Sequence, residues 1–195
     1  MGVGFSPPDP PLTDDIVTLR LWREDDAPEV ARCCSDEQIA YWLDMVPQPY
    51  TEQDARGYIA GAAQAWREGS GALFAVTDAR TGALLGSVGV RFVAPGDQTA
   101  EVGYWTRAEA RGRGATTRAL VLASRWALDL PEVERLQLRA APENVASQRV
   151  AEKAGFVREG VLRSAHFSPR QDRRLDWVMY SLLPSDPLPP TGARA

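Results

Sequence analysis

The sequence predicts a mixed α+β fold, in which a mostly antiparallel, seven-stranded sheet is flanked by about four helices. The chain has 195 residues, a size typical of one domain that buries most of its apolar surface without metals or disulfides. Strand-like and helix-like segments follow one another in the order strand, two or three helices, three strands, helix, strand, helix, two strands. A glycine-containing loop joins the fourth strand to the next helix, which makes this region a β-α-β unit.

The first half of the chain supplies one strand and the early helices. Residues 16–22 alternate between two faces with a period of two, which indicates a half-buried strand. A helix capped by Asp25 or Asp26 is expected to reach residue 34, and a short one to span residues 37–43 before two prolines. Thr51 and Asp54 have the spacing of a capping box, so a third helix should run from there to about residue 68.

The second half of the chain contains the remaining strands. Apolar, β-branched runs over residues 71–77 and 84–93 predict a hairpin, and residues 99–106 predict the next strand. Apolar residues at helical spacing predict a helix after the glycine loop to about residue 128, followed by a strand over residues 133–139. A helix over residues 145–154 should end at Gly155, before strands near residues 156–166 and 175–182.

Composition excludes several classes of function. A formal net charge of -4 and a pI near 5.1 argue against a nucleic-acid or anionic-membrane partner, because such partners favour basic surfaces. The only cysteines, Cys33 and Cys34, are adjacent, and there is one histidine, so no metal site is expected. These features suit a reducing, cytoplasmic location. No apolar run reaches the ~20 residues that a membrane span needs.

The two ends of the chain differ in composition from the middle. Residues 1–14 are rich in proline and lack the pattern of a signal peptide, and residues 184–195 are again rich in proline with few apolar side chains. We therefore expect a flexible leader, a single domain over residues 15–183 and a disordered tail.

The run Arg111-Gly112-Arg113-Gly114-Ala115-Thr116 has the features of a phosphate-binding loop. Two glycines let the backbone approach an anion, and the first turn of the following helix directs unpaired N–H groups and the positive end of its dipole to the same place. No Gly-Lys-Ser/Thr follows, and the spacing is not G-x-G-x-x-G. Nucleoside triphosphate hydrolysis and dinucleotide binding therefore fit poorly.

This loop and its flanks resemble those of the GCN5-related N-acetyltransferase (GNAT) superfamily, and in particular its Rim-type ribosomal-protein alanine N-acetyltransferase branch. The resemblance covers residues 16–183. It is carried by the order and spacing of the loop and four further motifs: Glu101-Val102-Gly103-Tyr104-Trp105, Asn144-Val145-Ala146-Ser147, Lys153-Ala154-Gly155-Phe156 and Glu159-Gly160-Val161-Leu162-Arg163. It implies an N-acetyltransferase that uses acetyl-CoA, without a metal, on a fold whose fourth and fifth strands splay apart to admit the pantetheine arm.

The resemblance also assigns the residues of the donor site. The pyrophosphate would lie on the loop. Arg111 occupies the fixed position of the motif, and Arg113 either binds phosphate or is solvated. Thr116 replaces the Gly or Ala that is usual at its position. The backbone of Tyr104, Trp105 and Thr106 would face the pantetheine arm, and a backbone N–H near Trp105 would polarise the acetyl carbonyl. The set of cofactor-binding residues expected on this basis is Tyr104, Trp105, Thr106, Arg111, Gly112, Arg113, Gly114, Ala115, Thr116, Asn144 and Ser147.

Stabilisation of the leaving thiolate is assigned to a serine. Many members of the superfamily have a tyrosine where this chain has Ala151, whereas the Rim-type branch has an Asn-x-x-Ser element. Ser147 would stabilise the thiolate through its hydroxyl, and Asn144 would anchor the pantetheine amide. Alternatively, Asn144 caps the helix that starts at Val145 and Ser147 lies in its first turn.

A general base and an acceptor pocket are harder to locate. Glu101 shares a strand face with Gly103 and Trp105, and burial could raise its pKa to suit a base; alternatively it is a solvent-facing charge at the strand end. Trp42 and His166 are expected on the acceptor side, although a lone histidine is more often structural.

The acceptor amine is expected to be a protein or peptide N-terminus. A lysine amine with a pKa of ~10.4 is almost wholly protonated at pH 7, whereas an α-amine with a pKa of about 7.7 to 8.0 is neutral at the ten per cent level and asks less of the base. Two alternatives stay open: acetylation of a small-molecule amine such as an aminoglycoside, polyamine or amino-acid derivative, and a non-catalytic acyl-CoA sensor, suggested by Ala151 and Thr116. The oligomeric state is not determined by the sequence, and a homodimer is compatible with it.

Overall fold

The computed structural model describes residues 4–190. In this part of the chain one eight-stranded sheet has the order β1-β2-β3-β4-β5-β6-β8-β7, and all neighbours are antiparallel except β5 and β6. The strands are β1 (Leu12–Thr13), β2 (Val17–Arg20), β3 (Gly71–Asp78), β4 (Leu84–Ala94), β5 (Thr99–Thr106), β6 (Arg135–Ala140), β7 (Val157–Ser168) and β8 (Arg173–Leu182). The mixed, mostly antiparallel fold is confirmed. The strand count is corrected from seven to eight, because the short β1 pairs with β2.

Five α-helices lie among the described residues, one at each segment where the sequence predicted a helix, against an expected total of about four. They are α1 (Ala27–Cys34), α2 (Glu37–Trp42), α3 (Glu52–Glu68), α4 (Ala115–Leu128) and α5 (Val145–Lys153). The helix ends follow local chemistry. The expected capping box forms at Thr51 and Asp54, and Gly69 ends α3 in the left-handed conformation.

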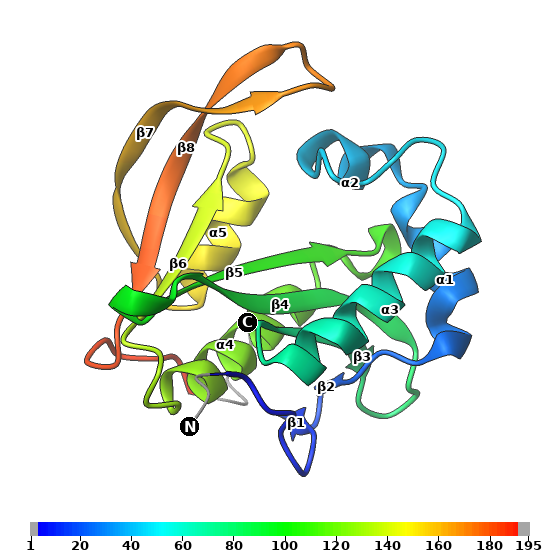
Figure 1. Cartoon of the computed structure of the whole chain (residues 1–195), viewed down its shortest axis with the longest axis horizontal. Coiled ribbons are helices and arrows are strands. Elements are labelled where there is room, and N and C mark those ends of the chain that lie inside the picture. The colour runs from blue at the N-terminus through cyan, green and yellow to red at the C-terminus, as the bar shows by residue number, and fades with distance from the viewer. Residues whose placement is uncertain (1–3, 191–195) are drawn as a thin grey trace.

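The sheet opens between β5 and β6. These parallel strands pair only over residues 99–101 and 135–137, and β6 then continues against β8. Figure 1 shows the resulting V, with β6, β7, β8 and α5 on one side and β5, β4 and α2 on the other. The splayed pair expected from the sequence is therefore present, as the fifth and sixth strands.

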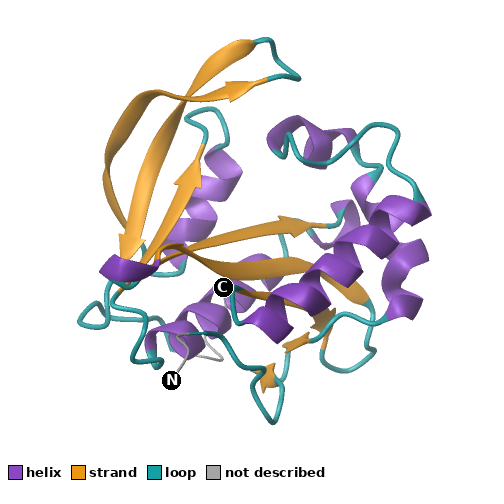
Figure 2. Cartoon of the chain, viewed as in Figure 1, coloured by secondary structure: helices purple, strands orange, loops and turns teal. Residues whose placement is uncertain are grey.

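Alternating side chains of the central strands supply two separate apolar cores. Even-numbered residues of β3, β4 and β5, such as Phe74, Val88 and Val102, pack with the buried face of α4. On the opposite face Ala75 and the side chains of α1, α2 and α3 form a second cluster, which Trp105 contacts. Figure 2 shows helices on both sides of the central strands. Buried side chains of β5, β6 and α5 all belong to the first core, so both walls of the splay are anchored in it.

The described parts of the two termini contact the domain, although their composition predicted a flexible leader and a disordered tail. Phe5 is 2% exposed and stacks on Phe92 with ring centroids 4.4 Å apart. Asp14 pairs with Arg118 of α4 at 2.7 Å. In the tail, Leu188 packs against the first core. Residues 1–3 and 191–195 lie outside the described residues.

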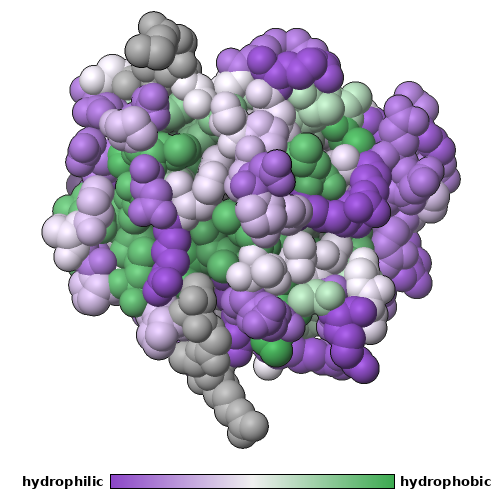
Figure 3. Space-filling model, turned by 90° about the horizontal axis from the view of Figure 1, so that it is seen from below, coloured by the Kyte–Doolittle hydropathy of each residue, from purple (hydrophilic) through white to green (hydrophobic). Residues whose placement is uncertain are grey.

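No helix within residues 4–190 combines the length and hydropathy needed to cross a bilayer. Figure 3 shows one face of the molecule, on which apolar residues emerge in patches separated by hydrophilic side chains.

Candidate active site

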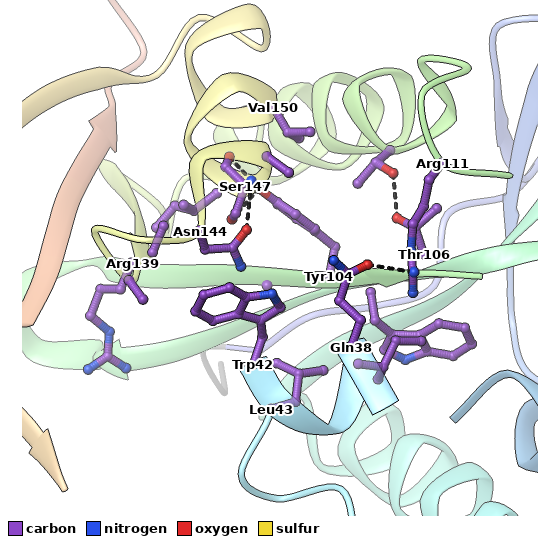
Figure 4. Close-up of a pocket in the computed structure, with 18 of the residues that line it drawn as sticks. Gln38, Trp42, Leu43, Tyr104, Thr106, Arg111, Arg139, Asn144, Ser147 and Val150 are labelled. Carbon is purple, nitrogen blue, oxygen red and sulfur yellow. Dashed lines mark hydrogen bonds between the residues drawn. The ribbon is translucent and has the colours of Figure 1, made fainter. Parts of the chain in front are cut away.

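A cavity of about 300 Å³ occupies the opening between β5 and β6. Its walls come from α2, from β5 and the loop after it, from the start of α4, from the end of β6 and from α5. Figure 4 shows Trp42, the last residue of α2, and Leu43 after it facing Asn144 and Ser147 across this space. The lining residues include Gln38, Trp42, Leu43, Tyr104, Trp105, Thr106, Arg111, Gly112, Thr116, Arg139, Asn144, Ser147, Val150 and Trp177.

The backbone of β5 offers free hydrogen-bonding groups to the cavity. In an antiparallel ladder the backbone groups of alternate residues point to the same neighbour. Arg107 donates its N–H to the carbonyl of Leu85 at 3.0 Å, so the odd-numbered residues of β5, Trp105 included, direct their backbone groups at β4. The backbone of Tyr104 and Thr106 therefore points toward the splay, where β6 is no longer paired with β5. Trp105 departs from expectation, since its backbone groups face β4 and not the splay.

The glycine loop has the geometry of an anion site. Gly112 and Gly114 have φ of +73° and +78°, a region that favours glycine. Gly114 is the N-cap of α4 and no side chain caps this end, so the first-turn amides of the helix are free to bind an anion. The hydroxyl of Thr116 is engaged by that of Thr106, which ties the start of α4 to the end of β5. The loop therefore opens onto the same cavity as the strand.

Arg111 joins the loop to α2. Its guanidinium pairs with Asp36, the N-cap of α2, at 3.0 Å and donates to Gln38 Oε1 at 2.6 Å. Burial alone would raise the pKa of Asp36, but the hydrogen bonds from Arg111 and from the first-turn amides of α2 outweigh it, and the pKa is lowered. Arg113 is exposed and does not line the cavity.

Asn144 and Ser147 lie at the start of α5, on the far wall. Asn144 Oδ1 accepts the Ser147 N–H at 3.1 Å, so the capping role is confirmed. The Ser147 side chain nevertheless points into the cavity, where its Oγ lies 2.9 Å from the hydroxyl of Tyr104. The same tyrosine hydroxyl donates to the Ser147 carbonyl at 3.0 Å. Burial raises the pKa of Tyr104 to about 12, so it is a neutral donor.

The expectation that burial raises the pKa of Glu101 is wrong. Burial does favour a raised pKa, but Arg139 and Arg91 hold the carboxylate, and the net effect is a lowered pKa. Arg139 binds both carboxylate oxygens, at 2.6 and 2.8 Å, Arg91 donates at 2.8 Å and Gln137 at 3.2 Å. Glu101 also does not line the cavity. A carboxylate with these donors has little tendency to accept a proton.

The acceptor side of the cavity is bounded by α2 and by the strands beyond the splay. Trp42 and Trp177 line it, and the guanidinium of Arg139 lies 6.0 Å from the Trp177 ring. His166 lies outside the lining. Its Nε2 is 2.7 Å from Asp44 Oδ2, and its ring is 5.4 Å from that of Trp177, so it joins β7 to the loop after α2.

The structure thus brings most of the expected residues together and leaves others out. Outside the wall of the main cavity lie Glu101, Arg113, Gly114, Ala115 and His166. Sequence reasoning missed Gln38 and Arg139. Arg139 had one usable signal, because it belongs to the polar side of the alternation in residues 135–140, on a strand whose neighbour diverges.

A strand with free backbone groups, a helix start open to an anion and a hydroxyl on the opposite wall together define the donor site of an acyltransferase. A model of the acetyltransferase (GNAT) domain matches residues 17–157. The chain belongs to this family, which confirms the GNAT prediction and, with it, an acetyl-CoA-dependent N-acyltransferase.

Named ribosomal-protein acetyltransferases are similar to the chain at low identity. The chain is 27% identical to the ribosomal-protein-serine acetyltransferase of Escherichia coli (strain K12) over 131 residues, which are 67% of this chain and 70% of that protein. RimL, a ribosomal alpha-N-protein acetyltransferase solved in complex with coenzyme A, has a TM-score of 0.77 at 18% identity, with 86% of this chain and 94% of that one covered. The ribosomal-protein alanine acetyltransferase of Vibrio fischeri has a TM-score of 0.76 at 20% identity, with coverage of 89% and 96%. These two structures show the same fold.

Proposed function

We propose that this enzyme acetylates the α-amine at the N-terminus of a protein or peptide, by direct attack of that amine on acetyl-CoA. The observation that carries the proposal is the single cavity that connects the start of α4, the free backbone edge of β5 and the hydroxyl of Ser147. In this arrangement the diphosphate lies at Gly112 and the first turn of α4, and the pantetheine arm runs along β5. The thioester then lies near Ser147.

The chemical steps follow from the groups around the thioester. A backbone N–H of Tyr104 or Thr106, directed into the splay, polarises the acetyl carbonyl as the amine attacks. The tetrahedral intermediate collapses with cleavage of the carbon–sulfur bond, and the Ser147 hydroxyl stabilises the thiolate. The amine proton passes to water, because the nearby carboxylate of Glu101 is held by arginines.

The charges around the cavity favour an α-amine. Its charged lining side chains are Arg111 and Arg139, and no carboxylate of residues 4–190 lines it. Three acidic residues close to lining positions are engaged: Asp36 by Arg111, Asp44 by His166 and Ser168, and Glu101 by Arg139. A polyamine or aminoglycoside carries several positive charges, and this wall offers no carboxylate to pair with them. An α-amine carries at most one charge and is already neutral at about the ten per cent level at pH 7, so it needs no strong base. The names of the ribosomal-protein acetyltransferase relatives support the same acceptor class.

An acceptor panel tests the proposal. Release of free thiol from acetyl-CoA is measured with a lysine-free peptide whose N-terminus is free, the same peptide with a blocked N-terminus, a blocked peptide that contains lysine, spermidine and an aminoglycoside. We expect turnover with the free N-terminus alone. Faster turnover with the lysine peptide or a small amine would assign a different acceptor, and binding of acetyl-CoA without thiol release from any amine would identify a sensor. A cytoplasmic location and a homodimer stay predictions.

A further inference from the structure

Tyr104 places a second hydroxyl group beside Ser147, from the opposite wall of the splay. Its ring packs with the core on the α4 side of the sheet, and its hydroxyl reaches α5 at the Ser147 carbonyl and Oγ, at 3.0 and 2.9 Å. One helical turn beyond Ser147, on the same face of α5, Ala151 is fully buried. The phenol of Tyr104, which comes from β5, thus approaches the same face of α5 that carries only a methyl group at position 151.

The number of protons limits what this pair can do. Tyr104 and Ser147 carry one hydroxyl proton each, and the phenol proton has two acceptors within reach. If Tyr104 donates to the Ser147 carbonyl, Ser147 bonds to Tyr104 through its own proton and has none left for a ligand. If Tyr104 donates to Ser147 Oγ instead, the serine proton is free to point into the cavity. The two arrangements differ only by rotation of hydroxyl groups.

We propose that Tyr104 is a positioning residue for acyl transfer, whose hydroxyl donates to Ser147 Oγ so that the serine proton donates to the thioester sulfur as its bond breaks. This inference rests on the proposed acetyl transfer. The carbon–sulfur bond breaks with its electron pair going to sulfur, both hydroxyl groups keep their protons, and the amine proton leaves to water. Growing negative charge on sulfur favours this arrangement, because a hydrogen bond to a charged acceptor is stronger than one to a carbonyl. The raised pKa of Tyr104 keeps the phenol protonated throughout.

A second tyrosine that contacts the same helix serves as a control that distinguishes the positioning role of Tyr104 from a purely structural role. Tyr180 of β8 also donates to α5, to Glu152 at 3.1 Å, and is fully buried, but it does not line the cavity. Tyr104→Phe and Tyr180→Phe each remove one hydroxyl that holds the same helix and keep the ring in the core. A purely structural effect would therefore appear in both variants.

The measurement is the ionisation of the thiol of bound coenzyme A, followed by the ultraviolet absorbance of the thiolate as pH is varied. It needs no acceptor, so it stands apart from the acceptor panel. In the wild type and in Tyr180→Phe the bound thiol should ionise about one pH unit below free coenzyme A, the shift expected from one good hydrogen bond to the thiolate. In Ser147→Ala and in Tyr104→Phe this shift should be lost, and the double variant should be no worse than Ser147→Ala alone.

The outcomes are distinct. An unchanged thiol titration in Tyr104→Phe, or a loss equal to that in Tyr180→Phe, would overturn the positioning role. Failure of the wild type to bind coenzyme A would remove the donor site on which the proposed function also depends. Where an acceptor is found, Tyr104→Phe should lower kcat about 3- to 10-fold, the range for one neutral hydrogen bond, with the KM for acetyl-CoA nearly unchanged.

Discussion

Replacing Gly86 with alanine should displace the end of β5 and weaken the binding of acetyl-CoA. Gly86 lies opposite Thr106 in the β4–β5 ladder. A Cβ atom at this position would lie 2.2 Å from the carbonyl oxygen of Trp105 and 3.1 Å from Thr106 Cα. Both contacts are with backbone, so no side-chain rotation can relieve them.

The size of the effect follows from these distances. An unstrained carbon–oxygen contact requires the β5 backbone to move by roughly 1 Å. Overpacking of this kind costs about 1–3 kcal/mol of folding free energy. The same shift misplaces the backbone groups of Tyr104 and Thr106 that face the splay. Loss of two hydrogen bonds to the pantetheine arm, at about 1 kcal/mol each, would raise the Kd for acetyl-CoA about 30-fold.

Gly89, on the same strand, provides the control. A Cβ there would meet the Leu73 side chain at 3.4 Å, an ordinary contact, so Gly89→Ala should fold and bind acetyl-CoA like the wild type. Calorimetric titration gives the Kd for acetyl-CoA, and thermal unfolding gives the stability. Equal Kd and equal Tm for Gly86→Ala and Gly89→Ala would refute the idea that close backbone packing at Gly86 sets the position of the donor site.

Three further predictions concern the loop, the N-terminal segment and an ion pair. Gly112→Ala and Gly82→Ala should each cost about 1–2 kcal/mol, because both have a positive φ and open space, but only Gly112→Ala should weaken acetyl-CoA binding by calorimetry; an equal effect would argue against the anion site. Phe5→Ala should cost about 3–5 kcal/mol in denaturant unfolding, and a neutral result would mean that this segment is not part of the core. Hydrogen bonds from Arg135 and a serine lower the pKa of Glu159 to about 2, so the pair stabilises the fold above the usual carboxyl range and this contribution is lost as pH falls toward 2. Because the pair is partly exposed, Glu159→Gln should lower the free energy of unfolding at pH 7 by up to about 1 kcal/mol, with the difference shrinking in acid; a difference independent of pH would contradict this.

Local patterns in the sequence identified the elements that form the proposed donor site. The alternation in residues 99–106 predicted a strand, and the apolar spacing after the glycine loop predicted a helix. Both patterns extend over only a few residues, and the structure places β5 and α4 there. Gly112 and Gly114 indicated the proposed anion site for the same reason, and both have the positive φ that such a loop requires. The Asn144–Ser147 spacing is also local, and the helix cap that it forms was one of the two interpretations considered.

Local sequence patterns could not predict which distant residues polar and terminal side chains would contact. Glu101 is isolated among its neighbours in sequence, yet Arg91 and Arg139 reach it from the strands on either side of β5. The segment around Phe5 has the composition of a flexible leader, but Phe92 and Trp126 provide a site for its ring. In both cases the decisive groups are far away in the chain.

The sequence by itself determined the family, the order of the elements and the glycine loop before α4, because each depends on backbone preferences and spacings within a short segment. Only the tertiary structure decided which hydroxyl group meets Ser147 and which charges meet Glu101. Hydrogen bonds and ion pairs form between groups a few ångströms apart, and Tyr104 and Ser147, on opposite walls of the splay, come that close only when β5 and α5 are both packed in place.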